Sequence, residues 1–165
     1  MTSALFSPIR LAELELPNRV VISPMCQYSA RDGCMTDWHL THLGSLSNSG
    51  ASLLVFEATA VERHGRISHG DLGLYDDDCE AALARVVAHC RRIGSTKLGI
   101  QIGHAGRKAS AQRPWEGGRA LSAAEDPWQT IAPSPIALAP GWPTPHEMTL
   151  QDIARVREAH AEAAG

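Results

Sequence analysis

The 165-residue sequence has no long apolar run, no secretory leader and no paired-cysteine motif. No segment approaches the roughly 18 apolar residues of a membrane span, and the first residues lack the charged and apolar regions of a signal peptide. The cysteines, Cys26, Cys34, Cys79 and Cys90, show no CxxC spacing. These absences predict a cytoplasmic protein with reduced thiols and no membrane partner, disulfide framework or zinc site.

A strong charge imbalance and the common nucleotide and hydrolase fingerprints are missing as well. The net charge of -3 argues against nucleic acid or an anionic membrane surface as the main partner. The patterns GxGxxG, GxxxxGK[ST] and GxSxG do not occur. A hydrophobic content of 44% with 20% charged residues is typical of one globular domain with a core.

Short apolar runs alternate with amphipathic helical patterns. The first run is β-branched and ends at Pro24, which predicts a strand buried on both faces. In the following helix, Trp38, Leu43 and Leu46 are expected to face the core. A strand–helix–strand–helix–strand order predicts parallel strands with right-handed crossovers. The predicted strands are 20–23, 53–56 and 97–102, and the predicted helices are 38–48, capped by Asp37, and 78–93.

Three further segments frame this repeat. Residues 5–16 alternate apolar and polar side chains, which predicts a small hairpin or an extended lead-in. Residues 103–148 are rich in Gly, Pro and Trp without periodicity, and such a long excursion is typical of a lid or binding loop. Thr149 and Asp152 then give a capping signal for a last helix, with Ile153 and Val156 on one side.

Chemically distinctive residues follow each predicted strand. Parallel strands bring their carboxyl ends to one face, so these residues are expected to converge. A carboxamide there can read a planar ring that offers both N–H and C=O, although a satisfied buried amide is the alternative. A thiol could tune such a ring or simply fill the core. The residues are Cys26 and Tyr28 on the first strand, Glu57 and Ala58 on the second, and Gln101 and His104 on the third.

The remaining cysteines and histidines carry weaker signals. Cys79 and Cys90 are predicted to be core residues on their helix, and Cys34 gives no signal. His39 and His42 lie one helical turn apart, but without a third ligand at matching spacing we expect a surface pair and no metal site. The cations of the run 104–108 could hold a phosphate or a carbonyl oxygen, or form a solvated loop.

Short motifs in a fixed order extend this pattern over nearly the whole chain. They are LFSP at 5–8, NR at 18–19, SPMCQY at 23–28, EATAV at 57–61, GRI at 65–67, GIQI at 99–102, HAGRKA at 104–109 and APS at 132–134. Together they resemble the old yellow enzyme family of flavin-dependent ene-reductases. The similarity is greatest to its bacterial xenobiotic-reductase branch, which has a cysteine beside the flavin.

The resemblance implies an α/β fold: the N-terminal three β/α units of a (β/α)8 TIM barrel, with an N-terminal hairpin and a long loop after the third strand. It also implies an FMN-dependent oxidoreductase that uses NAD(P)H to reduce the activated C=C bonds of α,β-unsaturated carbonyl or nitro compounds. The residues that it implies are Ser23, Pro24, Met25, Cys26, Ala58 and Gln101 for the flavin, and Cys26, Tyr28 and Lys108 for catalysis.

The main departure from the family is length. Such barrels have about 250 residues, so residues 1–165 are expected to form the N-terminal part of one barrel domain. The family's substrate-gripping histidines and phosphate-binding loops are then expected beyond residue 165, and the chain alone would lack essential residues. Two interpretations stay open: part of an ene-reductase completed by a second polypeptide or a homo-oligomer, or a catalytically incomplete fragment with a structural role.

Overall fold

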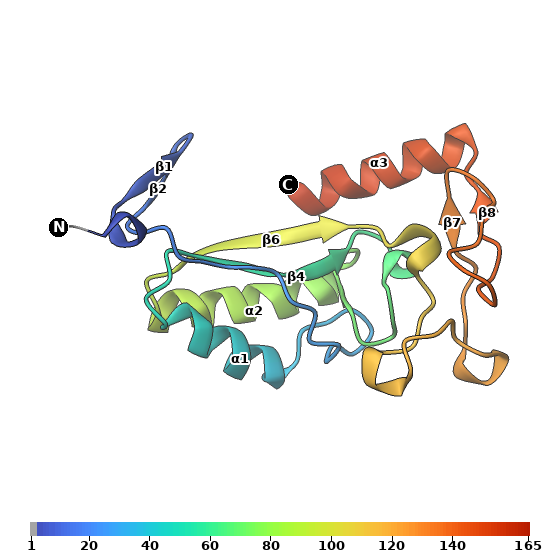
Figure 1. Cartoon of the computed structure of the whole chain (residues 1–165), viewed down its shortest axis with the longest axis horizontal. Helices are drawn as coiled ribbons and strands as arrows, with labels where there is room; N and C mark the ends of the chain where they lie inside the picture. Colours follow the sequence, from blue (N-terminus) through green and yellow to red (C-terminus); the bar gives the residue numbers. More distant parts are fainter. Residues whose placement is uncertain (1–2) are drawn as a thin grey trace.

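A computed structural model describes residues 3–165, and its centre is a parallel sheet. The strands β3 (Val21–Ile22), β4 (Leu53–Ala60) and β6 (Lys97–Gly103) lie in that order, with β4 in the middle. The short β5 (Leu72–Gly73) pairs with the end of β4. Helix α1 (Asp37–Ser47) lies between β3 and β4 in the chain, and helix α2 (Asp77–Ile93) lies between β4 and β6 (Figure 1). The predicted repeat and its parallel strands are therefore confirmed.

The remaining elements also agree with the sequence pattern. A hairpin of β1 (Ile9–Leu11) and β2 (Leu14–Leu16) precedes the sheet, near the amino-terminal ends of its strands (Figure 1). Between β6 and the last helix, α3 (Leu150–Ala164), the only strands in the described residues are β7 (Ile131–Ala132) and β8 (His146–Glu147). Single 3-10 turns complete the chain: η1 (Ala4–Phe6), η2 (Arg63–Gly65), η3 (Gly106–Lys108), η4 (Pro114–Glu116) and η5 (Ala123–Glu125).

Side-chain caps explain where the helices begin. The Thr149 hydroxyl accepts a hydrogen bond from the Asp152 N–H, and the Asp152 carboxylate accepts one from the Thr149 N–H, as predicted. Helix α2 begins one residue earlier than predicted, after Asp76, whose carboxylate accepts the Cys79 N–H. The N-cap of α1 is Thr36, so the assignment of this role to Asp37 was wrong.

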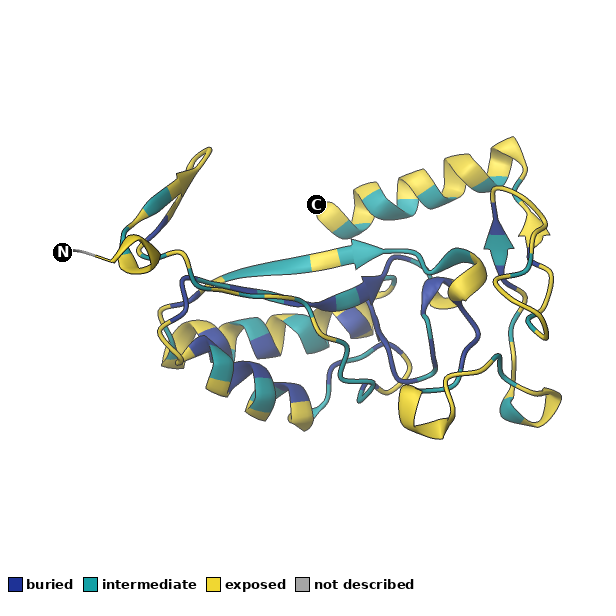
Figure 2. Cartoon of the chain, viewed as in Figure 1, coloured by how far each residue is buried: buried dark blue, intermediate teal, exposed yellow. Residues whose placement is uncertain are grey.

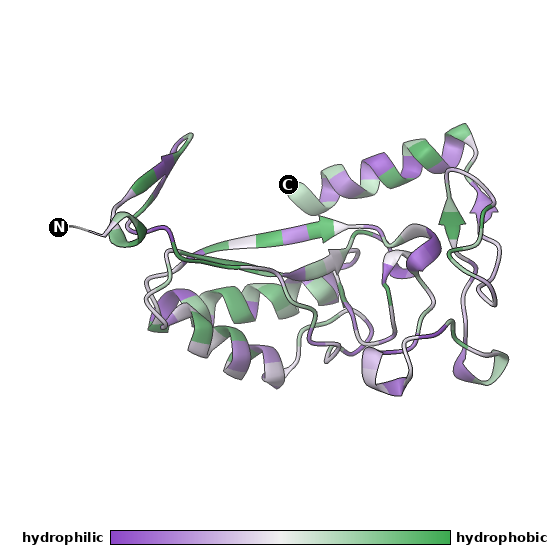
Figure 3. Cartoon of the chain, viewed as in Figure 1, coloured by the Kyte–Doolittle hydropathy of each residue, from purple (hydrophilic) through white to green (hydrophobic). Residues whose placement is uncertain are grey.

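The core lies between the sheet and the α1–α2 layer (Figure 2). Leu54 and Phe56 of β4, each 1% exposed, pack there against Leu43 of α1 and against Val86 and Cys90 of α2. Figure 3 shows hydrophobic and hydrophilic residues alternating along both helices, as expected of elements with one buried face. By contrast, α3 has no buried residue.

The opposite face of the sheet is open. Val21 is 49% exposed and Met25 53%, whereas Ile22 packs against the core. The prediction that the first strand is buried on both faces was therefore wrong, because only the helix-facing side has a packed layer. Among the described residues, no helix is both long enough and apolar enough to span a membrane.

A β-bulge in β4 determines which residues face the open side. The register to β6 shifts between Phe56 and Ala58. Without this shift, strict alternation would direct Glu57 to the open face and Ala58 to the helices. The bulge reverses their roles: Glu57 is 3% exposed on the helix side, and Ala58 pairs directly with Gln101 of β6. The end of β4 therefore places the small Ala58 side chain on the open face of the sheet and the buried Glu57 carboxyl group on the helix side.

Candidate functional site

A cavity of about 240 Å³ lies at the carboxyl ends of β4 and β6. Its walls combine small residues with a few polar groups, which is the usual composition of a ligand site. Predicted site residues Ala58, Gln101 and Lys108 all line it. Further lining residues that sequence reasoning did not assign to the site include Thr59, Arg66, Asp71 and Leu72. The expected convergence of strand ends is thus confirmed for the second and third strands.

Gln101 and Ala58 form one edge of this cavity as a cross-strand pair. The Gln101 side chain is exposed, which argues against the alternative of a satisfied buried amide. At Gly103, an added Cβ would meet no atom within 4 Å, so the wall beyond Gln101 is also open. A carboxamide next to such small neighbours is accessible to the edge of a planar ring.

Cys26 lies beside the cavity, next to the backbone of Ala58 and the carboxylate of Asp71. Burial, followed by the charges of Asp71 and Glu57, raises the pKa of the Cys26 thiol to about 11. Cys26 is therefore a neutral S–H at physiological pH, which suits a weak hydrogen-bond donor and not a thiolate nucleophile.

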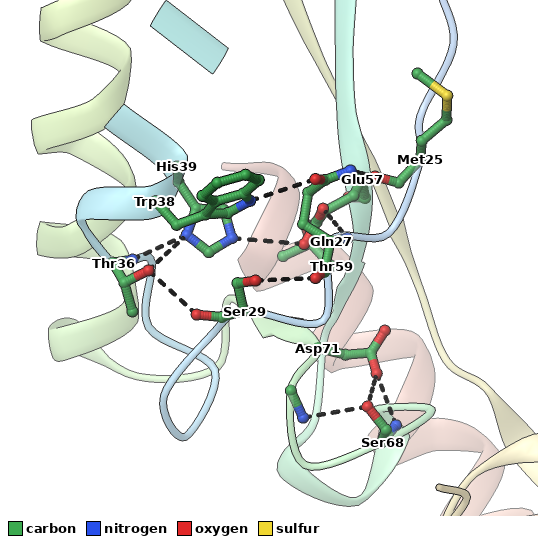
Figure 4. A network of polar contacts seen from close by, with 11 residues as sticks. Met25, Gln27, Ser29, Thr36, Trp38, His39, Glu57, Thr59, Ser68 and Asp71 are labelled. Carbon is green, nitrogen blue, oxygen red and sulfur yellow. Dashed lines mark hydrogen bonds and ion pairs between the residues drawn. The ribbon is translucent and has the colours of Figure 1, made fainter. Parts of the chain in front are cut away.

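Asp71 is the acidic group of the cavity and was missed by the sequence analysis. It is 2% exposed, and its Oδ2 accepts hydrogen bonds from the Ser68 N–H at 2.7 Å and the Ser68 hydroxyl at 2.5 Å (Figure 4). Within the described residues, its Oδ1 has no hydrogen-bond partner. Burial raises the pKa of Asp71. No sequence pattern marks it, because Ser68-His69-Gly70-Asp71 reads as an ordinary polar turn.

The cationic run after β6 splits between different partners. Lys108 lines the cavity, whereas the Arg107 guanidinium is exposed and donates to the Ile136 carbonyl. His104 also lines the cavity; its Nε2 lies 3.3 Å from Glu62, and burial lowers the pKa of its imidazole. Only part of the predicted cluster is therefore available to an anionic or carbonyl oxygen.

A second cation, Arg66, reaches the cavity from the loop after β4. Its side chain is 5% exposed and donates to Asp32 at 3.2 Å. Its guanidinium carbon lies 5.8 Å from the centre of the Trp128 ring, within cation–π range. The GRI motif at 65–67 pointed to this segment, but not to the role of its arginine.

The other predicted residues of the first strand lie at the border of the site. Ser23 and Met25 are exposed and Pro24 is half-buried, and none of the three lines the cavity. Tyr28 has a positive φ of 52°, and its ring packs edge-on against Trp115 at 5.5 Å, also outside the cavity wall. Burial raises the pKa of the Tyr28 phenol.

A buried polar network behind the cavity holds the segment that carries Cys26 (Figure 4). Glu57 accepts the Gln27 N–H at 2.6 Å, and its other carboxyl oxygen faces Nε2 of His39 at 3.6 Å. His39 is fully buried, so the predicted surface location of the His39–His42 pair was wrong for this residue. Its Nδ1 accepts the Thr36 N–H at 2.9 Å, which leaves the ring proton on Nε2, toward Glu57.

Trp38, predicted to face the core, instead lies on the outside of this network. It is 50% exposed and stacks on His42 with ring centres 5.8 Å apart. Its indole N–H donates to the Gln27 side chain at 3.3 Å (Figure 4). The prediction was wrong because helical spacing does not distinguish a core contact from one with a neighbouring loop. Among the described residues, no three His, Cys, Asp or Glu side chains are grouped to hold a metal ion.

Known proteins share both the sequence pattern and the fold of this chain. The sequence pattern of the NADH:flavin oxidoreductase / NADH oxidase family matches residues 4–165. The chain belongs to this family. It is 43% identical to an NADH:flavin oxidoreductase of Gibberella zeae over 99% of the chain and 40% of that protein. It is 39% identical to an NADPH dehydrogenase of Geobacillus thermodenitrificans over 99% of the chain and 44% of that protein.

A solved structure agrees with the fold. The old yellow enzyme from Pichia sp. AKU4542 superposes with a TM-score of 0.79 at 23% identity, over 98% of the chain and 42% of that structure. The predicted fold class, an N-terminal part of an old yellow enzyme barrel, is therefore confirmed. The chain spans less than half of the length of the relatives that it matches.

The residues of the cavity fit the FMN that this family uses with a nicotinamide reductant. The cross-strand pair of Ala58 and Gln101 offers a small surface next to a two-way hydrogen-bonding amide. The unpartnered Oδ1 of Asp71 adds an acceptor in the same wall. A planar ring with alternating donors and acceptors is the kind of group that such a wall binds.

The raised pKa of Cys26 leads to a first testable expectation. Moving the pKa from 9.0 to about 11 means that the thiolate forms only as the pH approaches 11. Two pKa units correspond to roughly a hundredfold less thiolate at about pH 8. Iodoacetamide should therefore label Cys26 in the native protein about a hundredfold more slowly than in the denatured protein, as followed by peptide mass spectrometry.

A variant at Asp71 separates the effect of the Asp71 charge on the Cys26 pKa from the shielding of the thiol against the reagent. Asp71→Asn removes a negative charge beside the thiol, so the Cys26 pKa should fall and native labelling should accelerate. Ser68→Ala is the matched control, because Ser68 contacts the same carboxylate and its replacement changes no charge. Equal labelling of Cys26 in native and denatured protein near pH 8 would contradict the raised pKa.

Proposed function

We propose that this chain supplies the flavin-side part of an FMN-dependent NAD(P)H oxidoreductase that reduces the activated C=C bonds of α,β-unsaturated carbonyl or nitro compounds. The observation that carries the proposal is the cavity that joins Ala58, Gln101 and Lys108 at the carboxyl ends of β4 and β6, with Cys26 beside it. Family membership over residues 4–165 supports the cofactor and the nicotinamide reductant.

In this proposal the protein positions the cofactor, and the flavin, when bound, supplies the hydride chemistry. Gln101 binds the polar edge of the ring, and Ala58 leaves room for its face. The neutral Cys26 donates its S–H and tunes the ring without acting as a nucleophile. Ser23, Pro24 and Met25, at the border of the cavity, would contact the bound ring, Tyr28 would contact the substrate, and Lys108 would place its charge near developing negative charge.

We further propose that residues 1–165 form the N-terminal part of a single (β/α)8 domain. Within the described residues, β3 and β6 each pair with β4 alone, so each has a free edge. The remaining strands then come from further polypeptide, on the same chain, on a second one or from another copy. The open sheet face also supports a second function, that of a catalytically incomplete fragment with a structural role, which would associate with another polypeptide through this face.

The second prediction tests the flavin edge. Gln101→Leu should weaken FMN binding, because the bound flavin would bury its polar edge, and each hydrogen bond lost there costs on the order of 1–3 kcal/mol, or roughly a 5- to 150-fold rise in Kd. The measurement is FMN titration by flavin fluorescence, together with the absorption spectrum of the protein purified from its natural host. Gln151→Leu, an exposed position in α3, is the matched control.

Turnover distinguishes the two functions. The oxidoreductase should oxidise NAD(P)H with a cyclic α,β-unsaturated ketone and lose FMN selectively in Gln101→Leu. An FMN-free protein that still associates through its open sheet face would support the structural role. FMN affinity that is equal in Gln101→Leu and Gln151→Leu would remove Gln101 from the site.

A further inference from the structure

Two cysteines far apart in sequence meet on the side of the Asp32–Gly33 turn. The Sγ atoms of Cys34 and Cys79 lie 3.7 Å apart, although 45 positions separate the residues. Both sulfur atoms face the same acceptor, the Asp32 carbonyl oxygen, at 3.9 and 3.8 Å. The proposed flavin chemistry uses neither residue, and neither lines the cavity.

The backbone holds both thiols in place. Cys34 closes a tight turn in which Arg31 and Cys34 exchange backbone hydrogen bonds of 3.1 and 3.0 Å. Asp32 and Gly33 have φ values of 49° and 84°, as the turn requires. Cys79 lies in the first turn of α2, where its N–H donates to the Asp76 side chain at 2.8 Å. The two sulfur atoms are therefore brought together by a hydrogen-bonded turn and the capped start of a helix.

The two thiols differ in accessibility. Cys34 is partly exposed, whereas Cys79 is 1% exposed. Burial raises the pKa of the Cys79 thiol, with further contributions from Asp76 and Cys34. Such a pair has one thiol that a small oxidant can reach and a second, protected thiol next to it that can resolve the first product.

We propose that Cys34 and Cys79 are a redox-active dithiol that a hydroperoxide converts reversibly to a disulfide. The Cys34 sulfur attacks the peroxide oxygen, which forms a sulfenic acid and releases one water from hydrogen peroxide. The Cys79 sulfur then attacks the sulfenic sulfur, forms the S–S bond and releases a second water. The two thiols lose two electrons in total, and the peroxide oxygen atoms leave as two waters.

Formation of the bond requires a short approach of the two sulfur atoms. A disulfide needs them at about 2.05 Å, so they must move closer by about 1.7 Å from their separation of 3.7 Å. The cross-link would join the loop after β3 to the start of α2. It would also fix the Asp32 turn, whose carboxylate pairs with Arg63 at 2.6 Å and with the cavity residue Arg66 at 3.2 Å.

The test treats the purified protein, in the assembly in which it is obtained, with hydrogen peroxide near neutral pH. Free thiols are then blocked with N-ethylmaleimide, and peptides are mapped by mass spectrometry without reduction. We expect a Cys34–Cys79 cross-linked peptide that dithiothreitol releases, and two of the four cysteines protected from blocking. The oxidised protein should unfold several degrees higher than the reduced protein, since the cross-link closes a long loop.

Variants and a denatured sample make the result decisive. Cys34→Ser should abolish the cross-link, while Cys90→Ser and Cys26→Ser should retain it. If Cys34→Ser fails to fold, oxidation of the wild-type protein in guanidinium chloride serves as the reference, because the selective pairing should then give way to mixed pairings. Irreversible Cys34 oxidation without a cross-link, or preferential pairing of any other two cysteines, would overturn the proposal.

Discussion

Replacing Glu57 with leucine is expected to lower the free energy of unfolding by about 1–3 kcal/mol, because a buried hydrogen-bond donor loses its acceptor. This donor is the Gln27 N–H, which donates to Glu57 at 2.6 Å. The buried His39 ring also loses the carboxyl oxygen that its Nε2 faces at 3.6 Å, a separation too long for a hydrogen bond. Denaturant unfolding of the variant, followed by circular dichroism, measures this loss.

The same substitution should disturb the cavity from behind. The Gln27 N–H, one residue from Cys26, loses its hydrogen bond, and the Glu57 charge that helps to raise the Cys26 pKa is removed as well. Native-state labelling of Cys26 should therefore accelerate in Glu57→Leu. Such a change in reactivity would not accompany a loss of stability confined to another part of the core.

Two controls separate the network from general effects of burial. Glu158→Leu makes the same change at an exposed position of α3 and should stay within about 0.5 kcal/mol of the wild type. A double-mutant cycle of Glu57→Gln with His39→Gln should give a coupling energy of 0.5 kcal/mol or more, as is typical of residues in one network. Additive effects of the two changes would contradict a direct His39–Glu57 interaction.

A polypeptide limited to residues 1–165 is expected to associate, or to unfold without one cooperative transition, when it is produced alone. In the described residues, β3 and β6 have one free edge each, and the open face exposes the apolar side chains of Val21 and Met25. Unpaired edges and apolar patches of this kind promote association. Bound flavin would add only about 4 kcal/mol at a thousandfold excess over its Kd.

Size-exclusion chromatography with light scattering, combined with thermal unfolding, tests this expectation. Val21→Lys places a charge on the open face and should reduce association. Ile136→Lys makes the same kind of change at a 60% exposed position of the long segment between β6 and α3, and it should not reduce association. A wild-type 165-residue chain that is a soluble monomer with one cooperative transition would show that the open face needs no partner.

The sequence by itself determined the order and type of the main elements. The β-branched and apolar runs and the Thr149–Asp152 cap depend on residues within a few positions of each other. The pairing of strand ends also followed from the parallel order, which is why Ala58 and Gln101 were correctly expected to converge. Local periodicity and parallel topology require no knowledge of distant contacts.

Only the tertiary structure decided which side of each element a residue occupies. The bulge at Glu57 exchanges the faces of two neighbouring residues, and a strand sequence does not reveal a shift of register against its partner. His39 became buried because that bulge places a carboxyl group opposite α1. The Cys34–Cys79 contact joins residues 45 positions apart. Each of these features depends on a partner brought near by folding, so no short stretch of sequence could contain it.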